Sequence, residues 1–188
     1  MAHYVATPSL DIGAAISLFF NRIFSIQGRS RRSEFWWAML MVFIINTFLI
    51  IPTFGIVTIL LWFITIPLKI RRLHDSGRSG WWLVAPAIVT VVVSIVFLIQ
   101  LIAIGGNNEN AMLMAFLGLG VPTLILLILF ELVFPLIMLI FFCMDSQMGD
   151  NKYGPSPKYI LTEGAAPTFM GMNGAQMYAH TTTKSPEM

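Results

Sequence analysis

Three long stretches almost without charge dominate this sequence of 188 residues. Residues 35–68 are 34 consecutive uncharged positions, residues 79–108 are 30 more, and residues 111–144 contain one charge, Glu131. Only 11% of the chain is charged, less than half the share of about 25% that is usual in soluble domains. A chain of this size cannot bury so much apolar surface in a core of its own, whereas a bilayer solvates it directly. The sequence therefore predicts an integral membrane protein.

Turn residues divide these stretches into four predicted transmembrane helices. Pro52-Thr53-Phe54-Gly55 interrupts the first stretch, and Gly105-Gly106-Asn107-Asn108 ends the second. The third stretch exceeds one upright helix, so residues 111–119 either extend a tilted span or form a separate interfacial segment. The expected spans, which form two hairpins, are 34–51, 55–70, 81–104 and 120–144.

The segments outside the spans are expected to be a helix and a tail. Residues 8–26 repeat apolar side chains at helical spacing, and Thr7 before Pro8 is typical of an N-cap and first helical position. This helix is expected to lie along the inner membrane surface. Residues 160–188 lack periodicity and are predicted to be a disordered cytoplasmic tail. The expected fold is an all-α membrane protein: an amphipathic interfacial helix, then a four-helix transmembrane domain within 27–159.

The basic residues set the expected orientation. All eleven Lys and Arg residues lie on the side that would carry the N-terminus, the 69–80 loop and the tail. Cytoplasmic loops are enriched in basic residues, so both termini are expected in the cytoplasm, with the chain in a bacterial inner membrane. The net charge of only +2, without a basic stripe, excludes nucleic acid as an expected partner.

The stretch RRLHDSGRSGWW at 71–82 gathers most of the side chains that carry chemistry. His74 and Asp75 are neighbours whose side chains would diverge on a helix, and no nucleophile, phosphate-loop or zinc motif occurs in the sequence. No catalytic residue, metal ligand or cofactor is therefore predicted.

Two interpretations of this stretch stay open. In one, arginine forks and the amides of Ser79 and Gly80 bind a phosphate, such as that of an anionic phospholipid headgroup. In the other, the residues only set topology and tie cytoplasmic segments together. Either way, we expect 71–82 to pack against 28–37 and the Tyr153-Gly154-Pro155 turn, with Glu34 facing Arg72. The candidate rim residues are Arg29, Arg32, Glu34, Arg71, Arg72, His74, Asp75, Arg78, Ser79 and Gly80.

Glu131 and Asn46 are polar residues expected deep within the spans. A charge at the centre of a span costs roughly 2.5–3.5 kcal/mol on insertion scales, which makes Glu131 a functional candidate. The preferred interpretation is a protonated Glu131 hydrogen-bonded to Asn46 or to a backbone carbonyl. The alternative is a proton or ion relay.

Three motifs together resemble a known family. They are GRSRRSEFWW at 28–37, RRLHDSGRSGW at 71–81 and NKYGPSP at 151–157. The sequence is similar over about residues 10–159 to the domain-of-unknown-function 805 family. The resemblance implies a four-span bacterial inner-membrane protein and implies no reaction. The long fourth apolar stretch with Glu131 departs from the family pattern.

The sequence thus favours a non-enzymatic structural or regulatory membrane component. Membrane lipids, a second copy of the chain or another membrane protein are the expected partners. A transporter subunit that uses Glu131 is the alternative, and an enzyme acting on lipid headgroups comes last.

Overall fold

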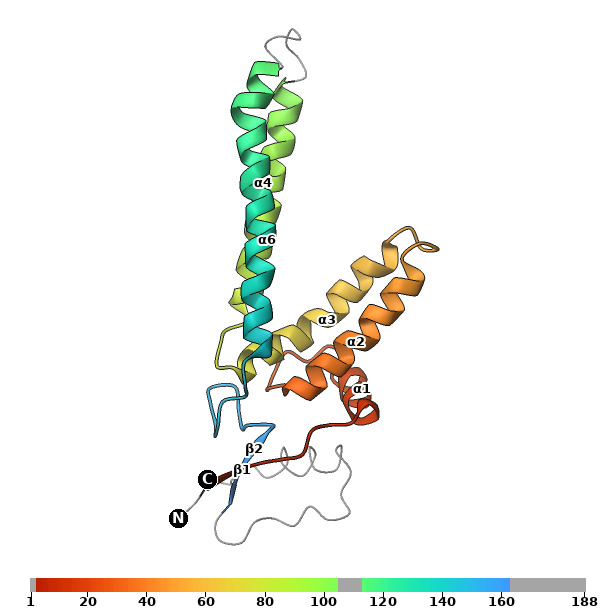
Figure 1. The fold of residues 1–188 in the computed structure, drawn as a ribbon, viewed down its shortest axis with the longest axis vertical. Coiled ribbons are helices and arrows are strands. Elements are labelled where there is room, and N and C mark those ends of the chain that lie inside the picture. Colours follow the sequence, from red (N-terminus) through yellow and green to blue (C-terminus); the bar gives the residue numbers. More distant parts are fainter. Residues whose placement is uncertain (1–2, 105–112, 163–188) are drawn as a thin grey trace. The chain divides into compact units, whose positions relative to one another are not determined.

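The computed structural model describes residues 3–104 and 113–162, and the described part is mostly helical (Figure 1). The chain divides into two compact units, Met1–Gly80 with Phe142–Met188, and Trp81–Phe141. The elements in chain order are β1 His3–Ala6, α1 Ile12–Asn21, α2 Arg32–Leu49, α3 Ile56–Asp75, α4 Trp81–Ile104, η1 Phe116–Gly120, α6 Val121–Cys143 and β2 Tyr159–Thr162.

Helix α1 is shorter than the predicted 8–26 segment. It begins after Asp11, whose carboxylate accepts a 2.7 Å hydrogen bond from the Ala14 amide, as an N-cap does. The prediction of Thr7 as the cap is therefore wrong. The Thr7 hydroxyl instead donates to the carbonyl of Lys158 at 3.1 Å. The Thr7 side chain is thus committed to the C-terminal segment and not to a helix start.

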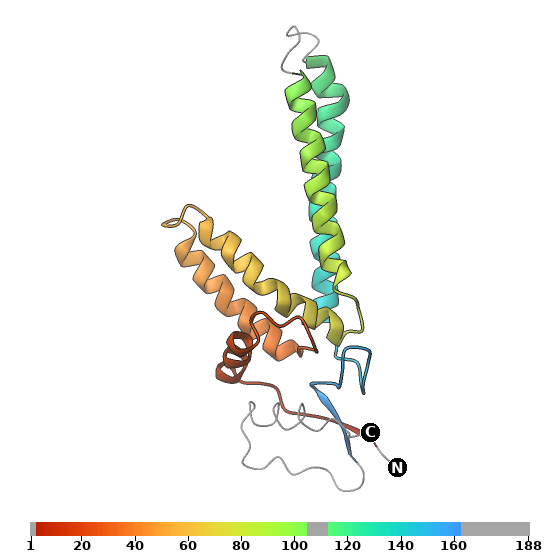
Figure 2. The same ribbon diagram turned by 180° about the vertical axis from the view of Figure 1, so that it is seen from behind.

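Helices α2 and α3 lie side by side as an antiparallel hairpin (Figures 1 and 2). The predicted turn at 52–55 lies between them, and Phe54 and Gly55 there have φ values of 49° and 79°. Phe19, Phe35, Ala38 and Leu68 form a buried apolar cluster that joins α1 to the hairpin. Most other large apolar side chains of the hairpin are exposed, which suits contact with lipid.

Helix α3 continues to Asp75, five residues beyond the predicted end at 70. Gly77 ends it in the left-handed conformation, with φ of 76°. Its amide donates to the His74 carbonyl at 3.0 Å, and the Arg78 amide donates to the Leu73 carbonyl at 2.8 Å. These two bonds are a Schellman motif. Arg71, Arg72 and Asp75 are therefore held on the last turns of a helix and not in a loop.

The second unit contains α4, η1 and α6, with α4 and α6 side by side in both views (Figures 1 and 2). Within the described residues, two helices are long and apolar enough to cross a membrane, Trp81–Gln100 and Leu113–Cys143. Of the undecided 111–119 segment, the described part is helical and continuous with α6. Its π-helical turn η1 precedes Pro122, which has no N–H to continue a regular helical ladder.

A two-stranded antiparallel sheet corrects two predictions. β1 pairs with β2, with His3 opposite Thr162 and Ala6 opposite Tyr159. The fold is therefore not purely helical, and the predicted disordered tail does not begin at 160. The remainder of that predicted tail, 163–188, lies outside the described residues.

Candidate functional site

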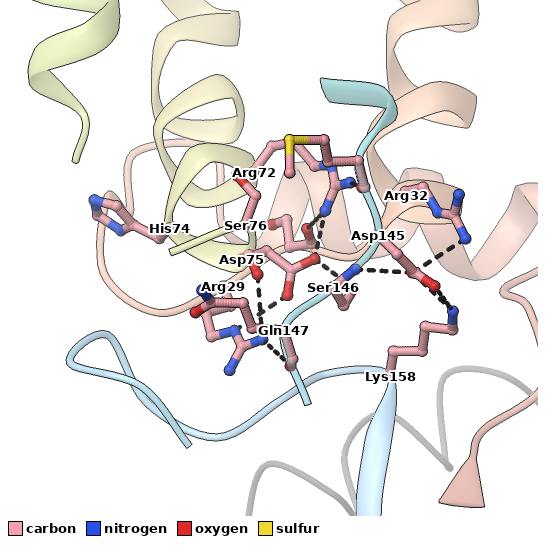
Figure 3. Close-up of polar contacts among 12 residues, drawn as sticks. Arg29, Arg32, Arg72, His74, Asp75, Ser76, Asp145, Ser146, Gln147 and Lys158 are labelled. Atoms are coloured by element: carbon pink, nitrogen blue, oxygen red, sulfur yellow. Dashed lines mark hydrogen bonds and ion pairs between the residues drawn. The ribbon is translucent and has the colours of Figure 1, made fainter. Parts of the chain in front are cut away.

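The first unit brings together three segments that carry most of the predicted rim residues (Figure 3). They are the stretch before α2, the end of α3, and the segment that follows α6. Arg29, Arg71, Arg72, Glu34 and Asp75 make the contacts between them and are called the arginine cluster below. Each of these five residues is at most 3% exposed.

Arg29 uses all of its guanidinium nitrogens as donors within the protein. Its Nε donates to Asp75 Oδ1 at 3.1 Å, and its Nη2 donates to the Gln147 carbonyl at 2.6 Å and the Asp75 carbonyl at 3.3 Å. Its Nη1 donates to the carbonyls of Gly149 at 2.8 Å and Gly154 at 3.2 Å. Arginine has five N–H donors in a fixed planar fork, and here five bonds account for them. Arg29 therefore holds the irregular backbone of 147–154 on the end of α3.

Arg72 supports the same carboxylate from the other side. Its Nη1 donates to Asp75 Oδ2, and its Nε donates to the Phe142 carbonyl at 3.1 Å. Its Nη2 donates to the Met144 carbonyl. The Ser146 hydroxyl also donates to Asp75 Oδ2, at 2.5 Å. Burial raises the pKa of the Asp75 carboxyl, while the Ser146 hydroxyl and the two guanidinium groups oppose that rise.

Arg71 contacts the segment before α2 through side chain and backbone. Its Nη2 lies 3.4 Å from Glu34 Oε1, and its Nε donates to the Ser30 hydroxyl at 2.9 Å. Its Nη1 donates to the carbonyls of Arg22 at 2.5 Å and Ser25 at 2.6 Å. The partner of Glu34 is thus Arg71 and not Arg72, which corrects the predicted pairing. Glu34 Oε2 is buried without a hydrogen-bond partner.

His74 lies at the side of the arginine cluster and contacts the C-terminal turn. Its ring stacks on Tyr153 with centroids 3.6 Å apart and planes at 4°, and its Nδ1 lies 3.3 Å from the Gly28 carbonyl. The Asn151 side-chain amide donates to the His74 backbone carbonyl at 3.0 Å. Burial lowers the pKa of His74; the Gly28 carbonyl opposes this and the charge of Lys152 adds to it.

Asp145 forms a second, exposed ion cluster. It pairs with Arg32 at 3.0 Å and with Lys158 at 2.6 Å, and it accepts a hydrogen bond from the Tyr159 hydroxyl at 3.0 Å. Partial burial alone would raise the pKa of Asp145, but bonds from Lys158, the Ser146 amide and Tyr159 lower it to about 2. Arg32 is therefore the predicted rim arginine that stays exposed, with 44% of its side chain accessible.

Arg78, Ser79 and Gly80 do not join the arginine cluster. They form the connection before α4, and all three are partly exposed. The Arg78 guanidinium lies 3.5 Å from the Ser76 carbonyl, close to its own backbone. The predicted phosphate site needed Arg71 and Arg72 beside these amides, whereas the guanidinium donors of both are directed to protein oxygens.

Glu131 and Asn46 have different partners from those predicted. Glu131 accepts a 2.6 Å hydrogen bond from the Thr90 hydroxyl, within the second unit. Asn46 accepts a 2.7 Å bond from the Thr58 hydroxyl, within the α2–α3 hairpin. Each residue is thus bonded to a threonine of the neighbouring helix of its own hairpin.

Several residues of the site were not predicted. Arg31 is 6% exposed and donates to the Thr7 hydroxyl at 2.9 Å, which links the stretch before α2 to the N-terminal segment. Ser146, Gln147 and Gly149 contribute mostly backbone carbonyls, which leave no signal in a sequence. Their one available signal was position, directly after the last apolar stretch and before the NKYG motif.

The chemistry of the arginine cluster is that of a structural joint. Three buried guanidinium groups face two buried carboxylates, and backbone carbonyls take the remaining donors. Within the residues that the structure describes, no group of three or more His, Cys, Asp or Glu side chains is placed to hold a metal ion.

Comparison with known proteins gives one family and two characterised relatives by name. Residues 23–155 match the family described as "Protein of unknown function (DUF805)". The chain is 26% identical over 150 residues to "Inner membrane protein YhaH" of Escherichia coli strain K12, covering 70% of this chain and 86% of the relative. It is 26% identical over 142 residues to "Inner membrane protein YhaI" of the same strain, covering 70% and 85%. No solved structure matches this chain.

Proposed function

Because this chain belongs to the DUF805 family of bacterial inner-membrane proteins, we propose that it is a structural or regulatory membrane component built around a rigid cytoplasmic joint. In this proposal, α2–α3 and α4–α6 are two hairpins that cross the bilayer, with both termini in the cytoplasm. The arginine cluster then fixes the cytoplasmic ends of the first hairpin and of the C-terminal segment.

The observation that carries the proposal is the complete use of Arg29. A group that recognises a ligand keeps donors directed at the place where the ligand binds, whereas the five N–H donors of Arg29 are taken by protein oxygens. Arg71 and Arg72 are 0% exposed and are likewise directed at carbonyls and carboxylates. Buried pairs of this kind add less stability than their contacts suggest, because desolvation opposes them, but removing one partner is costly. Such a joint serves to fix geometry.

Lipid contact is proposed for a different set of residues. Arg32 is exposed at the start of α2, and Trp36 and Trp37 of the same helix are 40% and 37% exposed. Arginine beside tryptophan is typical of the boundary between headgroups and acyl chains. We therefore assign the anionic headgroup contact to Arg32 and not to the arginine cluster.

Helix α1 supports the same placement, because it has three distinct sides. Its buried side, with Ala15 and Phe19, packs on the hairpin. Ile12 and Phe20, 50% and 54% exposed, form an apolar side, whereas Ser17 is exposed on a polar side. A helix divided in this way between apolar and polar exposure suits a membrane surface.

Cysteine labelling tests the proposed topology. In a Cys143→Ser background, Phe54→Cys lies in the α2–α3 turn and Asp150→Cys lies in the exposed C-terminal segment. An impermeant maleimide added to spheroplasts should label the first and spare the second. Labelling of Asp150→Cys alone would reverse the orientation, and equal labelling of both would contradict a membrane-crossing hairpin.

A further inference from the structure

The α4–α6 hairpin contains a hydrogen-bonded pair that the proposed joint does not explain. Glu131 is the single charged residue in the sequence of α6, and its side chain is exposed. It lies 12 residues before the helix end at Cys143, which is ~18 Å at 1.5 Å per residue. The carboxyl is therefore in the middle of one of the two helices that are apolar and long enough to cross a membrane.

The partner of this carboxyl comes from the other helix of the hairpin. The Thr90 hydroxyl donates to Glu131 Oε1 at 2.6 Å, and it keeps its lone pairs as acceptors. Thr90 lies within the candidate span Trp81–Gln100. The pair thus places carboxyl and hydroxyl oxygens together at a depth where solvent water is scarce.

Pro135 adds a third oxygen. It lies inside α6, four residues after Glu131. In an α-helix the amide of residue i donates to the carbonyl of residue i−4, and proline has no amide hydrogen. The Glu131 carbonyl consequently lacks its regular helical donor. Glu131 and Thr90 therefore supply carboxyl, carbonyl and hydroxyl oxygens, and all three can accept a cation.

We propose that Glu131 and Thr90 form a binding site for one small monovalent cation, a proton or a sodium ion, within the α4–α6 hairpin. The physical reason is the cost of an uncompensated carboxylate in hydrocarbon, which one positive charge removes. Oxygen ligands suit both cations, and either source leaves the pair neutral. This inference does not rest on the joint in the first unit.

A hydrophobic carbodiimide is the probe for this site. A protonated carboxyl adds its O–H across one C=N bond of the carbodiimide: oxygen bonds to the central carbon, the proton goes to nitrogen, and the acyl group then migrates to nitrogen. No group leaves, so the product is heavier by one whole reagent. In the purified full-length protein in detergent, mass spectrometry should find this adduct at Glu131. Labelling should fall as the pH is raised.

Sodium distinguishes the two sources. If sodium chloride lowers the labelling at fixed pH while potassium chloride does not, the site binds sodium. If neither salt matters and pH alone controls labelling, the site binds a proton. If Glu131 reacts only after denaturation, or reacts independently of both pH and sodium, the proposal is wrong. Glu34, with 0% exposure, is the internal control that should stay unlabelled in the folded protein.

A matched pair of variants tests the role of Thr90. Thr90→Val removes the hydroxyl that donates to Glu131, so the pH of half-maximal labelling should shift upward by about one unit. Thr123→Val is the control, because the Thr123 hydroxyl donates at 2.7 Å to the Leu119 carbonyl of its own helix. It should leave the labelling profile unchanged. Equal profiles for wild type and Thr90→Val would overturn the two-residue site.

Discussion

Arg29 donates from its Nε to the Asp75 carboxylate at 3.1 Å and joins residues 46 positions apart in the chain. Both side chains are at most 1% exposed. The other four bonds of Arg29 reach the Asp75 carbonyl and the carbonyls of 147–154, so this pair is the place where all three segments of the joint are held.

The first prediction concerns the planar fork of Arg29. Arg29→Lys keeps the charge but supplies fewer donors in a different geometry, so buried carbonyls lose their partners. Each such acceptor costs about 1–3 kcal/mol. We expect a clearly lower midpoint of thermal unfolding in detergent. Arg32→Lys is the control, because its exposed ion pair is worth only ~0–1 kcal/mol. Equal effects of the two variants would contradict the structural role of Arg29.

The second prediction concerns the pairing of Glu34 with Arg71. In a double-mutant cycle with Glu34→Gln and Arg71→Gln, contacting residues should show a coupling of about 0.5–3 kcal/mol. The same cycle with Lys158→Gln in place of Arg71→Gln should be additive, because Lys158 pairs with Asp145. The quantity to compare is the free energy of unfolding. A larger coupling with Lys158 would place Glu34 elsewhere.

The third prediction follows from the lowered pKa of His74. The ordinary value is 6.5, so lowering the pH below about 6.5 protonates the unfolded state first and reduces the free energy of unfolding. His74→Phe keeps a ring to stack on Tyr153 but does not titrate. Its thermal midpoint should therefore change less than that of the wild type between pH 7 and 5. Parallel pH profiles would exclude His74 as the source of the dependence.

The fourth prediction concerns Asp145, whose pKa is lowered from 3.8 to about 2. Its carboxylate contributes stability that is present above pH 3.8 and is lost as the pH falls through about 2. Asp145→Asn should thus be slightly less stable than the wild type at pH 5 and equal to it near pH 2. The difference should stay below about 1 kcal/mol, because the pair is exposed. A difference that grows toward low pH would contradict the assignment.

The fifth prediction concerns the sides of helix α1. Spin labels at Phe20→Cys and Ser17→Cys, each in a Cys143→Ser background, sample the apolar and the polar exposed side. In liposomes, oxygen should relax the first label more strongly, and a water-soluble nickel chelate the second. The same ranking for both labels would remove α1 from the membrane surface.

Much of the fold could be predicted from the sequence where local signals were strong. The uncharged stretches and the Pro52-Thr53-Phe54-Gly55 turn indicated the helices near their observed positions. The extension of α3 to Asp75 was missed, because charged residues next to an apolar stretch are typical of a loop at the membrane boundary. The Schellman motif at Gly77 shows why the helix continues.

The arginine cluster was predictable only in part. A surplus of arginines over Glu34 and Asp75 indicated ion pairs between segments and suggested that the remaining forks stay available to a phosphate. The surplus instead binds backbone carbonyls of 142–154, which no residue type reveals. Depth along the helices likewise matched Glu131 with Asn46, but depth alone could not distinguish Asn46 from Thr90.

The five bonds of Arg29 also impose an order on biogenesis. Asp75 follows Arg29 by 46 residues, and Gly154 follows it by 125. At a synthesis rate of ~5–20 residues per second, the last partner leaves the ribosome about 6–25 s after the guanidinium that will hold it. Both hairpins are translated within that interval. A chain stopped before Gly154 would carry a half-satisfied Arg29, which quality-control proteases can distinguish from the finished protein.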